Sequence, residues 1–420
     1  MIATLRQRNF FLLWFAGLVS FSGDWLLAVA LPVAVYQLTR SPLEVSLTLI
    51  AGTLPRIALG SVAGVFVDRW ERKRTMVIAN LLLAVTLLPL LLDLAVERLW
   101  LVYLVIFVKG VISQFLYPAE NAMLPELVSK DYLVPANALN TLNNNLARLI
   151  GPAVGGLVFG LAGLGVVVML DILTFVIAAG LILMISVTSK PVQTVTRTAS
   201  GAWAKMVRDW RDGLAFIRGD RVLRTIFLCV AMMAVGEGVM STLFAPFVTN
   251  VLGGTALEYG WLMSAQAVGG LLGGFAIARI GKDAKPALLF AVGAFFVGAI
   301  DLLIFNYAAF VPGVLPGILL FILVGIPAVG AMTGYTTLLH TQTADEYRGR
   351  VFGALGACWA LFMLVGMGFA GLMGERLGLG IINLQSLGYT LTGIVAFVML
   401  RAAVAEAPQT APQEVQQEAA

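Results

Sequence analysis

Apolar runs of about 20 residues or more follow one another along nearly the whole chain, separated by short polar segments. An α-helix rises 1.5 Å per residue, so such a run crosses the roughly 30 Å hydrocarbon core of a bilayer. Open strands leave backbone groups unsatisfied in hydrocarbon, so runs of this length must be helices. Soluble proteins are roughly 45–50% apolar and about 25% charged. This chain is 60% hydrophobic and 12% charged, which predicts an all-α integral membrane protein.

We predict twelve transmembrane helices, six in each half. A polar stretch at 189–221 divides them, and apolar residues recur at helical spacing within 202–217, which is typical of an amphipathic helix on the membrane surface. The expected domains are a helix bundle at 1–188, this linker, a second bundle at 222–402 and a disordered tail at 403–420. The predicted spans are 10–37, 44–66, 74–96, 98–119, 138–160, 165–187, 223–249, 256–278, 286–308, 314–338, 351–374 and 380–401.

The basic residues predict the orientation, because loops rich in Lys and Arg stay in the cytoplasm. With twelve spans, most of the 27 Lys and Arg residues fall in the loops on the side of both termini. Only Arg40, Arg98 and Arg376 fall in loops on the other side. We therefore expect a multi-pass protein of the inner or plasma membrane with both termini in the cytoplasm.

The segment 130–156 in the first half resembles the segment 345–371 in the second half at a constant offset of 215 residues, which indicates a duplication. Two six-helix repeats of the same orientation place a cavity between the halves, and rocking of one half against the other gives alternating access. The pattern therefore indicates a mechanism of transport as well as a fold. The matched pairs are Asp131 with Glu346, Tyr132 with Tyr347, Gly151 with Gly366 and Gly156 with Gly371.

The segment 64–74 resembles the loop signature of the major facilitator superfamily, which lies between helices 2 and 3 of that fold. The resemblance implies a secondary transporter in which this loop acts as a conformational latch. In the family the acidic and basic residues of the loop hold the cytoplasmic ends of the halves together in the outward-open state. The latch residues implied here are Gly64, Asp68, Arg69 and Arg72.

Two further similarities point to exporters. A glycine and proline run in the fifth predicted helix is similar to the family signature associated with antiporters, and such residues allow close helix packing and a bend. Segments 118–128, 136–139 and 348–353 resemble the branch that includes macrolide-efflux and enterobactin-export proteins. The antiporter-type residues are Gly151, Pro152, Gly155 and Gly156.

Charged residues inside the predicted helices are candidates for the transport site, because a charge at the bilayer centre needs a partner, water or a proton. Asp24 and Arg56 lie at similar depth in neighbouring helices, so we expect them to pair. The pair is either structural, or Asp24 takes up a proton and releases Arg56 or substrate. Glu237 has no evident partner in its half, which makes it a second candidate for a proton or a cationic substrate.

Lys109 and Arg148 also lie near mid-depth. They either favour an anionic substrate group together with Arg56, or Arg148 bonds backbone carbonyls or nearby asparagines while Lys109 extends to the surface. Asp171 and Asp301 lie toward the outer ends of their helices, where we expect water or a loop to solvate them.

The leading hypothesis is a monomeric proton-coupled exporter of small amphipathic compounds, in contact with membrane lipids and without cofactor, metal or nucleic acid. Export of an anionic metabolite or siderophore is the alternative within transport. A membrane sensor or an enzyme is a more distant alternative, since the sequence has no cofactor motif and a single His.

Overall fold

The computed structural model describes residues 2–67, 70–92, 94–186, 217–280 and 284–406 of the chain.

 Every regular element in these described ranges is a helix. The linker expected at 189–221 and the tail at 403–420 lie largely outside the described residues. The first half contains α1 Ile2–Leu5, α2 Arg8–Thr39, α3 Pro42–Val67, α4 Arg72–Leu87, η1 Leu88–Leu91, η2 Val96–Arg98, α5 Leu99–Leu127, η3 Lys130–Tyr132 and α6 Leu133–Leu183.

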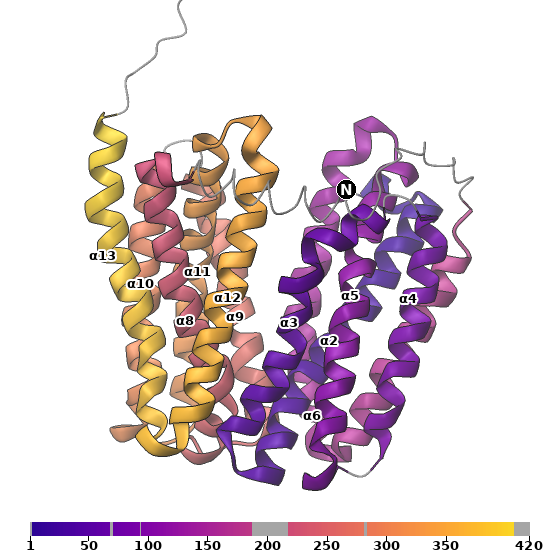
Figure 1. Ribbon diagram of the computed structural model, residues 1–420, viewed down its shortest axis with the longest axis horizontal. Coiled ribbons are helices and arrows are strands. Elements are labelled where there is room, and N and C mark those ends of the chain that lie inside the picture. The colour runs from indigo at the N-terminus through magenta and orange to yellow at the C-terminus, as the bar shows by residue number, and fades with distance from the viewer. Residues whose placement is uncertain (1, 68–69, 93, 187–216, 281–283, 407–420) are drawn as a thin grey trace, which may run out of the picture.

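The helices form two groups that stand side by side, with α2–α6 in one group and α8–α13 in the other (Figure 1). We call the end of the molecule where α2 begins and α13 ends the terminal face, and the other end the opposite face. The groups approach each other toward the opposite face (Figure 1). The second half contains α8 Arg221–Asn250, α9 Ala256–Ile280, α10 Pro286–Asn306, η5 Tyr307–Ala309, α11 Leu315–Gln342, α12 Asp345–Leu377, η6 Leu379–Ile382 and α13 Asn383–Glu406.

The described helices suit a bilayer in length and in surface chemistry. Ten of them are long and apolar enough to cross a membrane. Large apolar side chains are also exposed in the middle of helices, among them Leu81 at 44%, Leu361 at 49% and Val365 at 54%. Soluble monomers rarely expose apolar surface on this scale. The fold is therefore that of an all-helical, multi-pass membrane protein.

Two glycines break the helices at corresponding places in the two halves. Gly163 lies inside α6 with φ 77° and ψ 179°, between the two spans predicted there. Gly378 ends α12 with φ 75° and ψ 176°, a nearly identical conformation. It lies 215 residues after Gly163, the same offset that relates the two repeats. Only glycine adopts this backbone region readily. The turn at the opposite face is thus the same in both halves.

Replacing Gly163 with Ala should destabilise the protein by about 1–3 kcal/mol, because a side chain opposes this backbone conformation. No atom lies within 4 Å of the position of a Cβ at Gly163, so the backbone alone determines the effect. Thermal unfolding in detergent measures it. The control is Gly160→Ala, at a helical position that also has open space around it. Equal melting temperatures of the two variants would contradict the prediction.

The two halves are joined near the opposite face. There α3 packs against α12, and α6 packs against α9. The backbones come so close that a Cβ on Gly156 would lie 2.1 Å from the carbonyl oxygen of Ala256, and a Cβ on Gly371 would lie 2.6 Å from Cβ of Ser46. Hydrogen bonds across this contact join Tyr36 with Asn250, Ser41 with Glu375, Ser46 with Met367 and Ala153 with Ser264.

Candidate functional site

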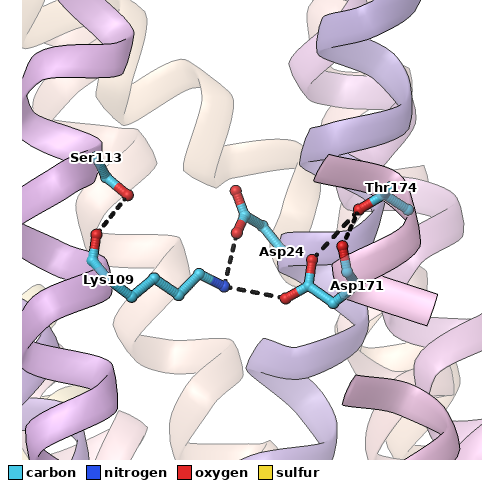
Figure 2. A network of polar contacts seen from close by, with 5 residues as sticks. All are labelled: Asp24, Lys109, Ser113, Asp171 and Thr174. Carbon is cyan, nitrogen blue, oxygen red and sulfur yellow. Dashed lines mark hydrogen bonds and ion pairs between the residues drawn. The ribbon is translucent and has the colours of Figure 1, made fainter. Parts of the chain in front are cut away.

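A lysine held between two aspartates lies in the middle of the first half. Lys109 on α5 places its Nζ 2.7 Å from Asp24 Oδ1 on α2 and 3.2 Å from Asp171 Oδ2 on α6. Figure 2 shows the lysine side chain extending from one helix to both carboxylates. The exposed fractions of the side chains are 14% for Lys109, 27% for Asp24 and 0% for Asp171. We call these three residues the triad; when all three are ionised it carries one excess negative charge.

The surroundings of the triad hold Asp171 in place. Thr174 Oγ1 donates to the carbonyl oxygen of Asp171 at 2.7 Å and lies 3.4 Å from its Oδ1 (Figure 2). A Cβ on Gly23 would lie 2.5 Å from Asp171 Oδ1, so only glycine lets α2 approach this close. The ammonium of Lys109 also lies 5.5 Å from the centre of the Phe175 ring, a favourable cation–π distance. Because Asp171 is fully buried and Asp24 is 27% exposed, Asp24 is the one carboxylate of the triad with access to solvent.

The expected pair of Asp24 with Arg56 is wrong in this structure, since Asp24 pairs with Lys109 instead. Arg56 lies on α3 with an exposed side chain. Helix α2 packs mainly along α6 rather than along α3. Similar depth in neighbouring helices was therefore insufficient to pair the two residues, because Lys109 on α5 contacts Asp24 instead. The alternative in which Lys109 extends to the surface is also wrong, because its Nζ contacts Asp24 and Asp171 and its side chain is only 14% exposed.

The two other aspartates are buried, contrary to the expectation that water or a loop solvates them. Asp171 is 0% exposed and contacts Lys109. Asp301 on α10 is 4% exposed and accepts a hydrogen bond from Gln385 Nε2 on α13 at 3.0 Å. Neighbouring helices cover both carboxyls at depths where the sequence alone suggested a solvated helix end.

Arg148 connects the two halves. Its Nη2 donates to Gln266 Oε1 on α9 at 2.7 Å, rather than to the asparagines of its own helix. The arginine also attracts Glu237 on α8 electrostatically. Tyr389 Oη on α13 lies 3.4 Å from Glu237 Oε2, at the long end of the hydrogen-bond range. Arg148 and Glu237 are thus polar groups of opposite charge contributed by opposite halves.

Two of the four predicted latch residues, Gly64 and Arg72, lie within the described residues. Arg72 begins α4, and its Nη1 lies 2.5 Å from Glu126 Oε1 and donates to the carbonyl oxygen of Ala122 at 2.8 Å, both on α5. Gly64 lies in α3 near its end. The other two, Asp68 and Arg69, lie outside the described residues. In this conformation Arg72 contacts its own half.

The antiporter-type motif on α6 packs in two directions. Toward α2, a Cβ on Gly151 would lie 2.4 Å from Trp25 Cβ, and one on Gly155 would lie 2.7 Å from Leu26 Cα. Toward α9, Gly156 approaches Ala256, and a Cβ on Gly260 would lie 2.1 Å from the carbonyl oxygen of Pro152. The motif therefore places α6 in contact with its own half and with the other half at the same level.

Sequence reasoning missed one buried acid, Glu120 on α5. Its side chain is 7% exposed, and a Cβ on Gly17 would lie 3.1 Å from Glu120 Oε1. The fourth predicted span ended at residue 119, whereas α5 continues to Leu127. An acidic residue directly after an apolar run, followed by further helix-forming residues, was the available signal.

Comparison with known sequences identifies relatives along nearly the whole chain. A family model described as transmembrane secretion effector matches residues 1–419. Macrolide efflux protein A from Streptococcus pyogenes is 26% identical, over 89% of this chain and 91% of the relative. Multidrug efflux pump Tap from Mycolicibacterium fortuitum is 29% identical, over 94% and 97%. An uncharacterized MFS-type transporter, YfiS from Bacillus subtilis, is 27% identical over 90% and 89%.

Solved structures share the fold at low sequence identity. A bacterial homologue of the iron transporter ferroportin in an inward-facing state has a TM-score of 0.73 at 14% identity, covering 93% of this chain and 98% of that one. A peptide transporter POT variant in complex with alafosfalin has a TM-score of 0.75 at 13% identity, covering 94% and 95%. The predicted family resemblance is confirmed. The chain belongs to the major facilitator superfamily, as a membrane transporter of the transmembrane secretion effector family and not an enzyme.

Proposed function

We propose that this transporter exports small amphipathic compounds by proton antiport, and that the triad is its coupling site. The relatives named as macrolide and multidrug efflux pumps support export of amphipathic compounds. The observation that carries the coupling proposal is the position of Lys109 between two carboxylates of unequal exposure. The transporter acts as a monomer in the plasma membrane, with both termini in the cytoplasm.

The proposed architecture has twelve membrane-spanning helices in two six-helix bundles at 1–188 and 222–402, with a linker at 189–221 and a tail at 403–420. Support comes from the ten helices that satisfy the criteria of length and composition. Among them α6 counts once although Gly163 divides it, and α3 adds a further helix of 26 residues. The matching turns and the matching glycine contacts of the two halves support their relation as repeats.

The triad can exchange a proton for a cationic group. Its excess negative charge attracts either a proton or an amine of the substrate, and Asp24 is the exposed carboxylate. A proton on Asp24 removes the attraction for a substrate cation, so the two do not bind together. Lys109 remains paired with Asp171 throughout, which keeps the buried carboxylate neutralised. Mutual exclusion at one carboxylate couples the two fluxes when the halves rock only with a proton or a substrate cation bound.

Alternating access supplies the second part of the mechanism. The contacts near the opposite face support a conformation that opens toward the terminal face, which the proposed orientation makes cytoplasmic. Rocking of the halves breaks these contacts and closes the cytoplasmic end. We propose that Asp68, Arg69 and Arg72 then latch the halves, with Arg72 exchanging its contact with Glu126 for one across the interface.

Asp24→Asn should impair drug-dependent proton movement in inverted vesicles that carry an inside-acid gradient and a pH dye. Addition of ethidium or a macrolide dissipates the gradient through the unaltered protein. The variant should reduce this flux at least about tenfold, the effect of losing only about 1.4 kcal/mol of attraction. Asp24→Glu, which keeps the carboxylate, should retain a measurable flux. Equal proton movement by the unaltered protein and Asp24→Asn would show that the coupling site is elsewhere.

Export of an anionic metabolite or siderophore remains the second candidate, and Arg148 favours it. This arginine lies at the interface of the halves with an exposed side chain. Lys109, however, is engaged by two aspartates and adds no free positive charge. Organic anions tested in the same vesicles distinguish the two candidates. A proton flux that organic anions cause and amphipathic cations do not would support the second candidate.

A further inference from the structure

A buried carboxyl in the second half has no basic partner in the described part of the chain. Asp301 on α10 is 4% exposed, and its Oδ2 accepts from Gln385 Nε2, 3.0 Å away on α13. The two helices approach closely at Gly298, where an added Cβ would lie only 2.3 Å from Thr390 Oγ1. Asp171, the buried aspartate of the first half, has a lysine in contact. Asp301 has an amide instead.

The amide has an unsatisfied oxygen. Gln385 is 4% exposed, and its Oε1 is buried without a hydrogen-bond partner. Buried side-chain carbonyls normally accept at least one hydrogen bond. An ionised carboxylate only accepts, whereas a neutral carboxyl has an O–H that donates. A proton on Asp301 therefore provides the donor that Gln385 Oε1 lacks.

Burial and the nearby carboxyl of Glu237 favour the neutral form of Asp301. Glu237 on α8 acts on it electrostatically, and Tyr389 on α13 and Tyr335 on α11 belong to the same neighbourhood. None of these side chains is basic. Arg148 acts on Glu237 from the other half. Burial of a charge without a partner is so costly that the group takes up a proton instead.

We propose that Asp301 and Gln385 form a second proton-binding site, in which a neutral carboxyl and an amide exchange a pair of hydrogen bonds. The proton resides on Asp301 Oδ1 and is donated to Gln385 Oε1, while Gln385 Nε2 donates to Oδ2; no other bond changes. One helical turn along α13, Tyr389 reaches Glu237 and connects this site to the interface of the halves. The site is separate from the triad, and only its use in transport depends on the proposed export function.

Infrared spectroscopy of the purified protein at neutral pH, without substrate, tests the proposal. The unaltered protein should show the carbonyl stretch of a protonated carboxyl, and Asp301→Asn should lack that component. Gln385→Leu should shift the band to higher frequency, because it removes the hydrogen bonds of the amide. Asparagine has nearly the shape of a neutral aspartic acid, so Asp301→Asn should also retain the melting temperature of the unaltered protein.

An identical band in the unaltered protein and Asp301→Asn would overturn the proposal. So would a rise in melting temperature with NaCl but not KCl that Asp301→Asn abolishes, since the site would then bind sodium. If Asp301→Asn does not fold, the band in Gln385→Leu decides, and an unshifted band overturns the site. The infrared experiment involves no transport, so a negative result does not contradict the coupling role of the triad. Conversely, a missing drug-dependent proton flux does not contradict proton binding at Asp301.

Discussion

Lys109→Met should destabilise the protein by about 3–5 kcal/mol, the effect of removing one partner from a buried ion pair. Methionine fills much of the same space but leaves Asp171, which is 0% exposed, without its positive partner. Asp24 then lies near a second carboxylate with no cation between them. A lowered melting temperature in detergent and loss of drug transport are the expected observations.

Two control variants separate charge from packing in this experiment. Lys109→Arg keeps the positive charge and should retain most of the stability. Lys109→Met combined with Asp24→Asn and Asp171→Asn removes all three charges, so it should recover stability without recovering proton coupling. A melting temperature of Lys109→Met equal to that of the unaltered protein would mean that the triad does not stabilise the fold.

Gly156→Val should prevent the halves from closing at the opposite face. The carbonyl oxygen of Ala256 lies only 2.1 Å from the position of the first added carbon atom. Overpacking of a close contact costs about 1–3 kcal/mol, which lowers the ratio of the closed to the open state roughly five- to 150-fold. Transport should fall, because each cycle passes through this state.

Spin labels at Ser41 and Glu375 report the closure, since these side chains are in contact across the halves. With Cys229 and Cys358 replaced by serine, the labelled pair should give a short distance in the unaltered background and a longer one with Gly156→Val. The matched control is Gly160→Val, one turn further along the helix, where no atom lies within 4 Å of the added carbon. The same distance in both variants would mean that Gly156 does not control closure.

The helical membrane fold could be predicted because the length of an apolar run and the requirement for backbone hydrogen bonds act locally. Ends of helices were harder. The fourth span was predicted to end at residue 119, but α5 continues to Leu127, which hid Glu120. The gap predicted between the fifth and sixth spans contains Gly163, where α6 breaks.

The pairing of charges could be predicted only in part. Sequence gives the depth of a residue along its helix, and it placed Asp24 and Lys109 near the middle of the membrane. It does not give the face of the helix that meets a neighbour, which depends on how helices far apart in sequence pack. Asp24 was therefore assigned to Arg56, and Asp171 was assigned to a solvated helix end, whereas the structure brings Asp24 and Asp171 to one lysine.

Binding-linked proton release tests most directly whether proton and substrate compete for Asp24. Ethidium is added to purified protein in weakly buffered detergent, and the pH change and the bound ligand are measured together. The account predicts that the unaltered protein releases protons as ethidium binds and that Asp24→Asn releases none. Binding of ethidium to the unaltered protein without proton release, or equal release from both proteins, would contradict the account.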